Sequence, residues 1–464
     1  MAKYKAYPAY KTTGLGWLTE IPDHWEVKKL KYLGQAIIGL TYSPDDVVDE
    51  GEGTLVLRSS NVQNGKLEFL DNVYVRKSIP LHLKVKEGDI LICARNGSRA
   101  LIGKNAKITK DAEGMTFGAF MSIFRSRYNN YLSHVFASAL FEYQSGSFLT
   151  ATINQLTTSN LNSFEIPLPP QTEQDRIVNF LDHETAKIDN LIEKQQQLIE
   201  LLKEKRQAVI SHAVTKGLNP DVPMKDSGVE WLGEVPEHWT ISTLKHHAKF
   251  IDGDRGSEYP NDNDLVDDGV VFLSSKNISN WEINIDDANY ISREKFNRLN
   301  RGKTINGDVI VKVRGSTGRI GELAIFETER LNKSTAFINA QMMIIRLKNS
   351  FNNRFLCNVA QGHYWMEQLN VGAYGTAQQQ LNNAIFSGMI MVVPPIDEQL
   401  TINKFLELEI KRFDGLIKNT SNMIQLIQER RTALISAAVT GKIDVRDWVA
   451  PDMQVIEESQ EVTA

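Results

Sequence analysis

The sequence predicts an α+β protein in which two pseudo-repeated mixed α/β domains are separated by two long helices forming an antiparallel coiled coil. Two observations predict this fold: several blocks of sequence occur twice, and each copy closes in a long segment with heptad-like apolar spacing. We expect the first domain at 1–168, the first helix at 169–218, the second domain at 219–393 and the second helix at 394–446. An acidic tail at 447–464 is expected to be disordered.

The repeat is clearest at the start of each copy. Residues 17–25 read Trp-Leu-Thr-Glu-Ile-Pro-Asp-His-Trp, and residues 231–239 read Trp-Leu-Gly-Glu-Val-Pro-Glu-His-Trp. We interpret this block as a packing motif around its tryptophans. Repeated units of this size are whole domains rather than solenoid turns, so two equivalent halves are expected to touch a two-part ligand.

Between the Trp-rich block and the closing segment, each copy has short runs rich in Val, Ile and Leu, broken by Gly, Asn and Asp. Gly88-Asp89 and Gly307-Asp308 each introduce such a run, which is typical of a turn followed by a strand. The middle regions are therefore predicted to be mixed α/β with many short strands.

Each copy closes in a segment with the pattern of a long helix. A double proline precedes it, Thr172 or Asp397 is expected to cap the first turn, and Glu173 or Glu398 suits the positive end of the helix dipole. Gly217 and Gly441 are expected stops. Apolar residues recur at alternating steps of four and three, and this expected seam consists of Ile177, Leu181, Ile188, Leu191, Leu198, Leu202, Val209, Ile402, Leu406, Phe413, Leu416, Met423, Ile427 and Leu434.

A helix from Thr172 to Thr215 would be about 65 Å long, and its narrow apolar seam needs a partner. The nearest segment with a matched seam is the other copy. We therefore predict that the two helices pair as an intramolecular spacer that holds the middle domains apart. The alternative is that each helix packs on its own domain as an ordinary amphipathic helix.

Length and composition limit the classes of protein to which this chain can belong. The chain of 464 residues fits two to four domains, and its two cysteines, Cys93 and Cys357, fall at non-matching points and are expected to be buried free thiols. The N-terminus has no apolar leader, and the longest apolar stretch, near 389–393, is too short to span a bilayer. A reducing cytoplasm is the expected location.

No catalytic motif is complete in this sequence. Residues 97–105 resemble a phosphate-binding loop, but the glycines are one residue too far apart and Asn105 replaces the Ser or Thr that binds magnesium. The histidines lack metal spacing, and neither proline pair lies in the Asp/Asn-Pro-Pro-aromatic motif of amino-methyltransferases. We expect no active site, no metal site and no cofactor in this chain.

Three polar loops recur at the same stage of both copies and are the candidate DNA contacts. Glycine permits close backbone approach, Arg grips guanine or phosphate, and Asn or Gln reads adenine. Each loop alone also fits a solvated turn, and the net charge of −5 means that DNA binding would need a local basic face. The candidates are Arg58, Ser60, Asn61, Arg95, Asn96, Ser98, Arg99, Lys104, Asn154, Gln155, Lys276, Asn277, Arg314, Ser316, Thr317, Arg319, Gln379 and Gln380.

With these motifs together, the chain resembles a specificity subunit of a type I DNA restriction-modification system over nearly its whole length. The resemblance is carried by the paired Trp-Leu-x-Glu-Ile/Val-Pro-x-His-Trp blocks and the Gly-Asp strands followed by Arg/Gly loops. It is also carried by the Pro-Pro-x-x-Glu-Gln helix starts and the Ala-Val/Leu-Ile-Ser-x-Ala-Val-Thr helix ends.

The resemblance implies that each middle domain is a target-recognition domain reading one half of a split, asymmetric site in double-stranded DNA. It also implies two modification (methyltransferase) subunits, which use S-adenosylmethionine to methylate adenine and dock on the long helices. Two ATP-dependent restriction subunits, which translocate and cut DNA with ATP and Mg, would complete the complex. Catalysis would then belong to these partners. Two alternatives from other classes remain: a stand-alone DNA-modifying enzyme, and a coiled-coil scaffold that does not bind DNA.

Overall fold

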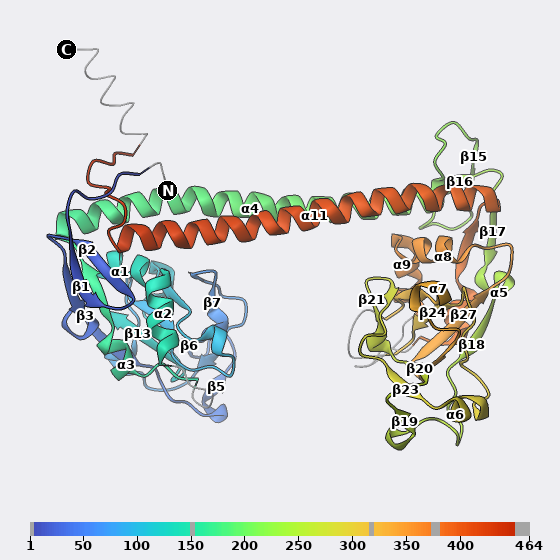
Figure 1. The fold of residues 1–464 in the computed structure, drawn as a ribbon, viewed down its shortest axis with the longest axis horizontal. Helices are drawn as coiled ribbons and strands as arrows, with labels where there is room; N and C mark the ends of the chain where they lie inside the picture. The colour runs from blue at the N-terminus through green and yellow to red at the C-terminus, as the bar shows by residue number, and fades with distance from the viewer. Residues whose placement is uncertain (1–3, 149–153, 315–319, 373–380, 451–464) are drawn as a thin grey trace, which may run out of the picture. The chain divides into compact units, whose positions relative to one another are not determined.

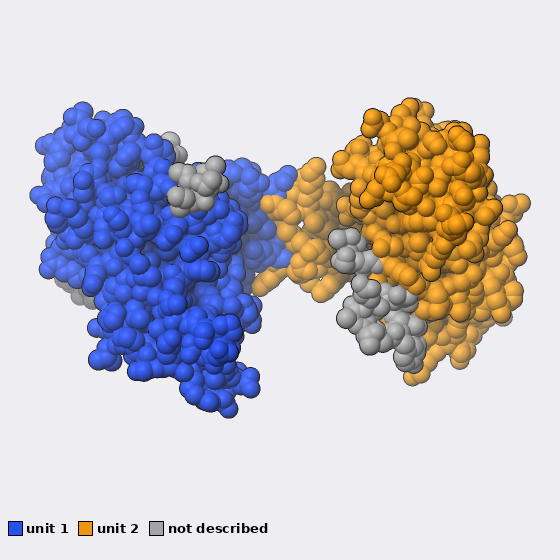
Figure 2. Space-filling model, turned by 90° about the horizontal axis from the view of Figure 1, so that it is seen from below, with its two compact units in different colours: residues 1–196, 422–464 blue, residues 197–421 orange. Residues whose placement is uncertain are grey.

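The computed structural model describes residues 4–148, 154–314, 320–372 and 381–450. The chain divides into two units, coloured separately in Figure 2. Unit 1 contains residues 1–196 and 422–464, and unit 2 contains residues 197–421. Each unit therefore combines one middle domain with part of both long helices, which differs from the contiguous boundaries expected from the sequence.

Unit 1 contains two four-stranded sheets (Figure 1). The first has the order β11-β10-β13-β4 and is antiparallel, and the second has the order β12-β6-β9-β5, in which β12 and β6 are parallel. Their bounds are Gln35–Ile38 (β4), Val47–Val48 (β5), Thr54–Leu57 (β6), Tyr74–Val75 (β9), Ile90–Cys93 (β10), Asn105–Lys107 (β11), Thr116–Phe117 (β12) and Met121–Arg125 (β13).

Unit 2 repeats both sheets with the same strand order. The antiparallel sheet is β25-β24-β27-β18, and the mixed sheet is β26-β20-β23-β19 with β26 and β20 parallel. The bounds are Ala248–Asp252 (β18), Leu265–Val266 (β19), Val270–Leu273 (β20), Asn289–Ile291 (β23), Val309–Lys312 (β24), Leu323–Ile325 (β25), Ala336–Ile338 (β26) and Met342–Leu347 (β27). The predicted repeat of mixed α/β domains is confirmed.

Short helices and strand pairs complete each unit. Equivalent helices are Asn129–Phe136 (α1) and Asn353–Ala360 (α8), Ala139–Ser147 (α2) and His363–Gly372 (α9), and Thr158–Ser163 (α3) and Asn383–Gly388 (α10). Equivalent strand pairs are Glu26–Lys29 (β3) with Glu165–Leu168 (β14) and Thr240–Thr243 (β17) with Ile390–Val393 (β28). Hairpins join Tyr10–Leu15 (β1) to Leu18–Pro22 (β2), Val62–Gln63 (β7) to Lys66–Leu67 (β8), Met224–Asp226 (β15) to Glu234–Pro236 (β16), and Ile278–Ser279 (β21) to Glu282–Ile283 (β22). Three further helices, Leu244–His247 (α5), Arg293–Arg298 (α6) and Thr328–Leu331 (α7), belong to unit 2.

The two long helices are Gln171–Lys216 (α4) and Ile396–Val439 (α11), and they lie side by side in both units (Figure 1). Asp189 pairs with Arg431 in unit 1 and Arg206 pairs with Asp414 in unit 2, so residue numbers rise along one helix as they fall along the other. The predicted antiparallel pairing is confirmed. Gly217 and Gly441 follow the helices with φ of 77° and 71°, the left-handed conformation expected of a glycine stop.

The expected seam is correct at five residues, partly covered at five and wrong at four. The partly covered residues are Ile188, Leu202, Val209, Ile427 and Leu434. Ile177, Leu181, Ile402, Leu406 and Phe413 are buried. Four expected seam residues are between 41% and 49% exposed, namely Leu191, Leu198, Leu416 and Met423. Their neighbours Ile192, Ile199, Ile417 and Ile424 are the better covered residues. At these four points the better covered position is therefore displaced by one residue from the expected seam.

The expected caps Thr172 and Asp397 are also wrong, since each helix begins one residue earlier and both residues lie within the first turn.

The repeated His-Trp blocks hold the beginning of each long helix. In unit 1 the indole Nε1 of Trp25 donates to Glu173 Oε1 across 3.0 Å, and His24 Nε2 lies 2.7 Å from Glu173 Oε2. In unit 2, Trp239 and His238 make the same two contacts with Glu398, at 2.9 and 2.6 Å.

Each buried indole also touches a helix end. A Cβ added to Gly441 would lie 2.3 Å from Cδ of Pro22 and 3.3 Å from the Trp25 ring, and one added to Gly217 would lie 3.1 Å from the Trp239 ring. The block therefore fastens the start of one long helix beside the end of the other within each unit, which confirms that it is a packing motif.

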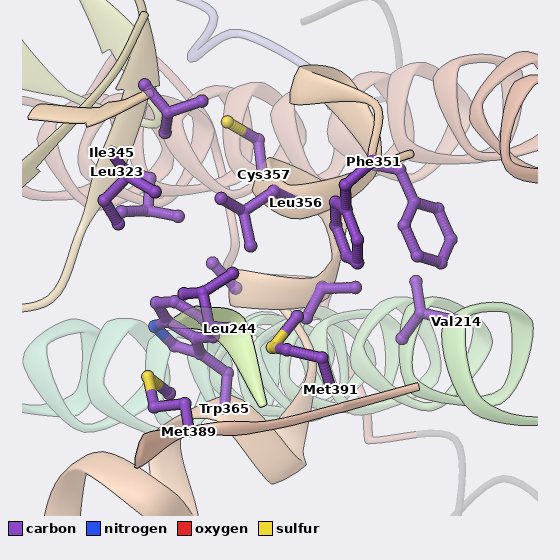
Figure 3. Close-up of a cluster of buried hydrophobic side chains, with 14 of the residues drawn as sticks. Val214, Leu244, Leu323, Ile345, Phe351, Leu356, Cys357, Trp365, Met389 and Met391 are labelled. Atoms are coloured by element: carbon purple, nitrogen blue, oxygen red, sulfur yellow. The ribbon is translucent and has the colours of Figure 1, made fainter. Parts of the chain in front are cut away.

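The largest buried cluster of unit 2 joins the antiparallel sheet to the helices (Figure 3). Val214 from α4 packs in the same cluster as Ile345 from β27 and Trp365 from α9, so the long helix is part of the domain core. Cys357 of α8 lies in this cluster, and burial raises the pKa of its thiol to about 12. Both Cys93 and Cys357 are free and buried, as expected.

The chain after α11 packs on unit 1 before the acidic tail begins. The Trp448 ring lies 5.4 Å from that of Phe180 on α4, in an edge-on contact. Packing on unit 1 therefore includes Trp448, and residues 451–464 of the predicted tail lie outside the described residues. Within the described ranges, the helices are all too short or too polar to cross a membrane.

Candidate nucleic-acid interface

Unit 1 brings its three candidate loops together. The side-chain amide of Asn96 donates to Ser59 Oγ across 3.3 Å, which joins the 95–99 loop to the 58–61 loop. Asn154 donates to the carbonyl of Gly97 across 3.3 Å, and Arg95 forms an isolated β-bridge with Gln155. The predicted set, which comes from distant parts of the sequence, thus forms one local surface.

Asn61 and Asn277 need a corrected role. Asn61 is fully buried, and its side chain accepts from the Arg58 amide at 2.9 Å and donates to the Glu68 carbonyl at 3.0 Å. Asn277 repeats this arrangement with the amide of Ser274 at 2.9 Å and the carbonyl of Asn284 at 3.1 Å. Both amides are therefore engaged in shaping the loop, which gives these residues a structural role in holding their neighbours.

Arg58 and Ser60 lie on the shaped loop but are partly covered. Arg58 donates from Nη2 to the carboxylate of Asp71 at 2.7 Å, which offsets part of its charge. Its Nε and the hydroxyl of Ser60 are buried atoms with no hydrogen-bond partner among the described residues. Such atoms carry a desolvation cost that a polar ligand could relieve.

The loop after β10 carries the most exposed candidates. Arg95, Ser98 and Arg99 are exposed, and the Arg95 guanidinium lies 5.2 Å from the centre of the Phe120 ring. The Ser98 amide donates to Asn96 Oδ1 at 2.9 Å, which closes the turn. Lys104 follows the loop and donates to Gln63 Oε1 at 3.2 Å, which ties it to the end of β7.

The strands β10 and β24 lead into these loops, and an ion pair holds the start of each strand. Arg125 holds the buried Asp89 at 2.6 Å before β10, and Arg346 holds the buried Asp308 at 2.7 Å before β24. The hydrogen bonds to Asp308 raise the pKa of Arg346. Because each ion pair joins the start of one strand to a residue of the neighbouring strand, it supports the sheet that carries the loop.

Unit 2 has the same arrangement around Arg314. The amides of Arg314 and of the preceding residue donate to the carbonyl of Gln341, at 3.2 and 2.9 Å. Ser275 on the equivalent of the 58–61 loop donates from Oγ to Gln341 Oε1 at 3.3 Å, and Lys276 beside it is exposed. The remaining candidates of this unit, Ser316, Thr317, Arg319, Gln379 and Gln380, lie outside the described residues.

Two residues at these surfaces were missed from the sequence, Phe120 in unit 1 and Gln341 in unit 2. They precede β13 and β27, and the signal that could have found them is the shared Ala-x-Met pattern of 119–121 and 340–342. The pattern is short and apolar, so it does not stand out in the sequence as part of a polar surface.

A hollow of about 780 Å³ adjoins the candidate surface of unit 1. Its lining includes Arg58 and Ser60 from the shaped loop, Tyr42 and Val47 from the preceding chain, and Phe120. Within the part of the chain that the structure describes, no group of three or more His, Cys, Asp or Glu side chains is placed to hold a metal ion. The surface is thus built from hydrogen-bonding, cationic and aromatic groups.

Comparison with known proteins agrees with this arrangement. The family model for the type I restriction modification DNA specificity domain matches residues 22–201 and 236–426. The chain is 23% identical over 449 residues to the type I restriction enzyme EcoKI specificity subunit of Escherichia coli (strain K12), covering 94% of this chain and 93% of that protein. The identity and coverage are the same for the StySPI specificity subunit of Salmonella potsdam.

Among solved structures, one chain from a study of complex assembly and conformational transition of the type I R-M system superposes with a TM-score of 0.66. The superposition covers 91% of this chain and 99% of that chain, at 15% sequence identity, and therefore shows a shared fold.

Proposed function

Because the chain belongs to the family defined by the type I restriction modification DNA specificity domain, we propose that each unit reads one half of a split, asymmetric DNA site. The observation that carries the proposal is the repeated surface, in which the shaped loop of each unit contacts a neighbouring segment: Ser59 contacts Asn96 in unit 1, and Ser275 contacts Gln341 in unit 2. The two surfaces have the same backbone and different side chains, such as Arg58 against Ser274 and Phe120 against Gln341. Two surfaces with the same backbone and different side chains suit a DNA site whose two halves differ.

The long helices are proposed to fix the unread spacer between the half-sites. Both helices have residues in both units. In this proposal, the length of the helices sets the distance between the two DNA-reading surfaces. A heptad inserted after residue 196 of α4 and another after residue 421 of α11 would add about 10 Å while keeping the seam in register. We expect the recognised site to gain about three unread base pairs.

The exposed apolar side chains of the helices are proposed to bind two modification subunits. Unit 1 exposes Leu191, Met423 and Leu426, and unit 2 exposes their repeat equivalents Leu416, Leu198 and Leu201. Because both units present the same apolar set, two copies of one partner are the natural occupants.

Catalysis is proposed to lie in those partners and in the restriction subunits. The modification subunits would use S-adenosylmethionine to methylate a flipped adenine, and the restriction subunits would use ATP and Mg. This chain would then supply sequence recognition alone. The assembly would act in the cytoplasm, where its DNA is found.

Mapping methylated adenines in DNA modified by the assembled complex tests the proposal. We expect one two-part motif with unlike halves. Replacing residues 30–168 by the equivalent domain of a relative should change one half and keep the other. A continuous or palindromic motif, or a replacement that alters both halves, would contradict it, and methylation by this chain without partners would favour the stand-alone enzyme.

A further inference from the structure

One exposed position at which the two units differ lies next to Arg95 in unit 1 and next to Arg314 in unit 2. We propose that this position, Phe120 in unit 1 and Gln341 in unit 2, determines base preference in each half-site, with Phe120 reading a thymine and Gln341 an adenine. This inference rests on the proposed function and deepens it by naming the residue and the base.

Phe120 and Gln341 occupy the same place in the repeated fold. Phe120 lies between β12 and β13, and Gln341 lies between β26 and β27. The two strands before them pair in parallel with equivalent partners, β6 and β20, in the same register. The next residues, Met121 and Met342, are both buried, whereas Phe120 and Gln341 are both exposed.

The backbone at this position holds the arginine loop in both units. The carbonyl of Phe120 accepts from the Arg95 amide at 2.9 Å, and the carbonyl of Gln341 accepts from the Arg314 amide at 3.2 Å. A side chain at this position therefore emerges beside the arginine of its own unit. Both groups would reach the same short stretch of base edges.

Phe120 has the chemistry of a thymine contact. Phe120 is 61% exposed, so its apolar ring is open to a ligand, and the Arg95 guanidinium lies 5.2 Å from the ring centre. The ring lines the hollow together with Tyr42, Pro44 and Val47, which give it apolar walls. In the major groove only thymine offers a methyl group to an apolar side chain.

Gln341 has the chemistry of an adenine contact. A glutamine amide accepts from the adenine N6 amino group through Oε1 and donates to N7 through Nε2. Ser275 donates to Gln341 Oε1 across 3.3 Å, which orients the amide before DNA binds. A carbonyl oxygen has two lone pairs, so Oε1 can keep this contact while it accepts from adenine.

Selection from randomised duplex DNA tests the assignment. The full chain, alone and co-expressed with its methyltransferase partner, would be compared with F120Q, Q341F and Y143Q, the last a matched change at an exposed aromatic residue of α2 in unit 1. We expect F120Q to change the preferred base at one position of one half-site and Q341F at one position of the other. Y143Q should leave both halves unchanged.

Base analogues test the contacts themselves. Replacing the assigned thymine by deoxyuridine removes one methyl group and should weaken binding about threefold to fivefold. Replacing the assigned adenine by 7-deazaadenine should weaken binding about tenfold. F120A and Q341A, which keep the backbone contacts, should each be insensitive to the analogue in their own half-site.

The failures of the inference and of the proposed function are distinguishable. If the wild-type chain selects a two-part motif and F120Q or Q341F leaves every base preference unchanged, the assignment is overturned while the proposed function stands. Equal sensitivity of F120A and the wild type to deoxyuridine also overturns it. If the wild type selects no motif at all, the proposed function itself fails.

Discussion

Arg206 on α4 donates from Nε to Oδ1 of Asp414 on α11 across 3.0 Å, and the repeat-equivalent pair in unit 1 has the helices exchanged. There Arg431 on α11 donates to Asp189 on α4 across 2.7 Å. Counted from the double proline before each helix, the two arginines are equivalent and so are the two aspartates. An antiparallel pair of repeated helices makes any cross-helix contact twice, and this ion pair is such a contact.

We predict that the Arg431–Asp189 pair stabilises unit 1 measurably. A double-mutant cycle with Arg431→Ala and Asp189→Ala should give a coupling free energy of about 0.5–1 kcal/mol in urea unfolding, because both side chains are more than two-thirds covered. The solvent-exposed Lys203–Glu200 pair, three residues apart on α4, is the control and should couple by no more than about 0.5 kcal/mol. A coupling free energy below that of the control pair would show that the Arg431–Asp189 pair does not stabilise unit 1.

The two long helices show which features of the fold could be predicted from the sequence. Their existence, pairing and direction follow from the repeat and from the apolar spacing, which are properties of whole segments. The sequence could not show that Ile192 is better covered than Leu191, because both are apolar and the step of three or four is ambiguous at that point. Only the folded structure selects the register, in which Arg206 pairs with Asp414 and Arg431 pairs with Asp189 across the two helices.

The glutamates at the starts of the long helices should differ in importance. The Glu173 side chain is 6% exposed, and it accepts from Trp25 and from the Tyr7 hydroxyl, whereas the Glu398 side chain is 41% exposed. We expect Glu173→Ala to lower the unfolding free energy by about 2–4 kcal/mol, since it leaves buried donors unpaired. Glu398→Ala should cost about 1 kcal/mol.

Hydrogen–deuterium exchange locates the effect of these two variants. Glu173→Ala should speed exchange in the first turns of α4 and in the segment after α11, because Trp25 touches both. Glu398→Ala is the matched control and should affect only the first turns of α11 and the segment after α4. Equal losses of stability in the two variants would contradict the burial argument.

The buried carboxylate of Asp254 makes the stability of unit 2 depend on pH. Backbone amides, first that of Gly256 and then those of Asn300 and Arg301, hydrogen bond to it and lower its pKa. A lowered pKa in the folded state means that the stabilisation is complete above the unfolded value near 4 and is lost as the pH falls through the folded value.

We therefore expect Asp254→Asn to lower the unfolding free energy by about 1–2 kcal/mol at pH 7 and by less at pH 3. Urea unfolding of the variant and the wild type at both pH values measures the difference. The exposed Asp267→Asn is a suitable control, with no difference expected at pH 7. A gap for Asp254→Asn that stays constant down to pH 3 would disprove the role of the carboxylate charge.

The candidate interface was predictable as a set of loops but not residue by residue. Arg95 and Asn96 follow a recognisable Gly-Asp strand, so their loop stands out in the sequence. Asn61 looks like a base reader by residue type, yet its amide closes the turn, and no local pattern separates these two uses of asparagine. Phe120 looks like a core residue, and only the paths of β12 and β13 leave its ring exposed.

The equivalent arginines Arg95 and Arg314 should act on different halves of the DNA site. Each follows the central strand of its unit and is held by the backbone carbonyl of Phe120 or Gln341. We expect Arg95→Ala to weaken binding by about 1–3 kcal/mol and to relax base preference within one half-site only, and Arg314→Ala to do the same within the other half-site.

Binding selection with each variant, repeated at two salt concentrations, measures the effect of the two arginines. Lys107→Ala changes an exposed residue of β11 in unit 1 and should leave the base preference of both half-sites unchanged. If Arg95→Ala weakened binding to all sequences equally and flattened the salt dependence, Arg95 would contact phosphate. It would then position unit 1 on DNA, and sequence reading in that half would fall to its neighbours, because a phosphate contact carries no base information.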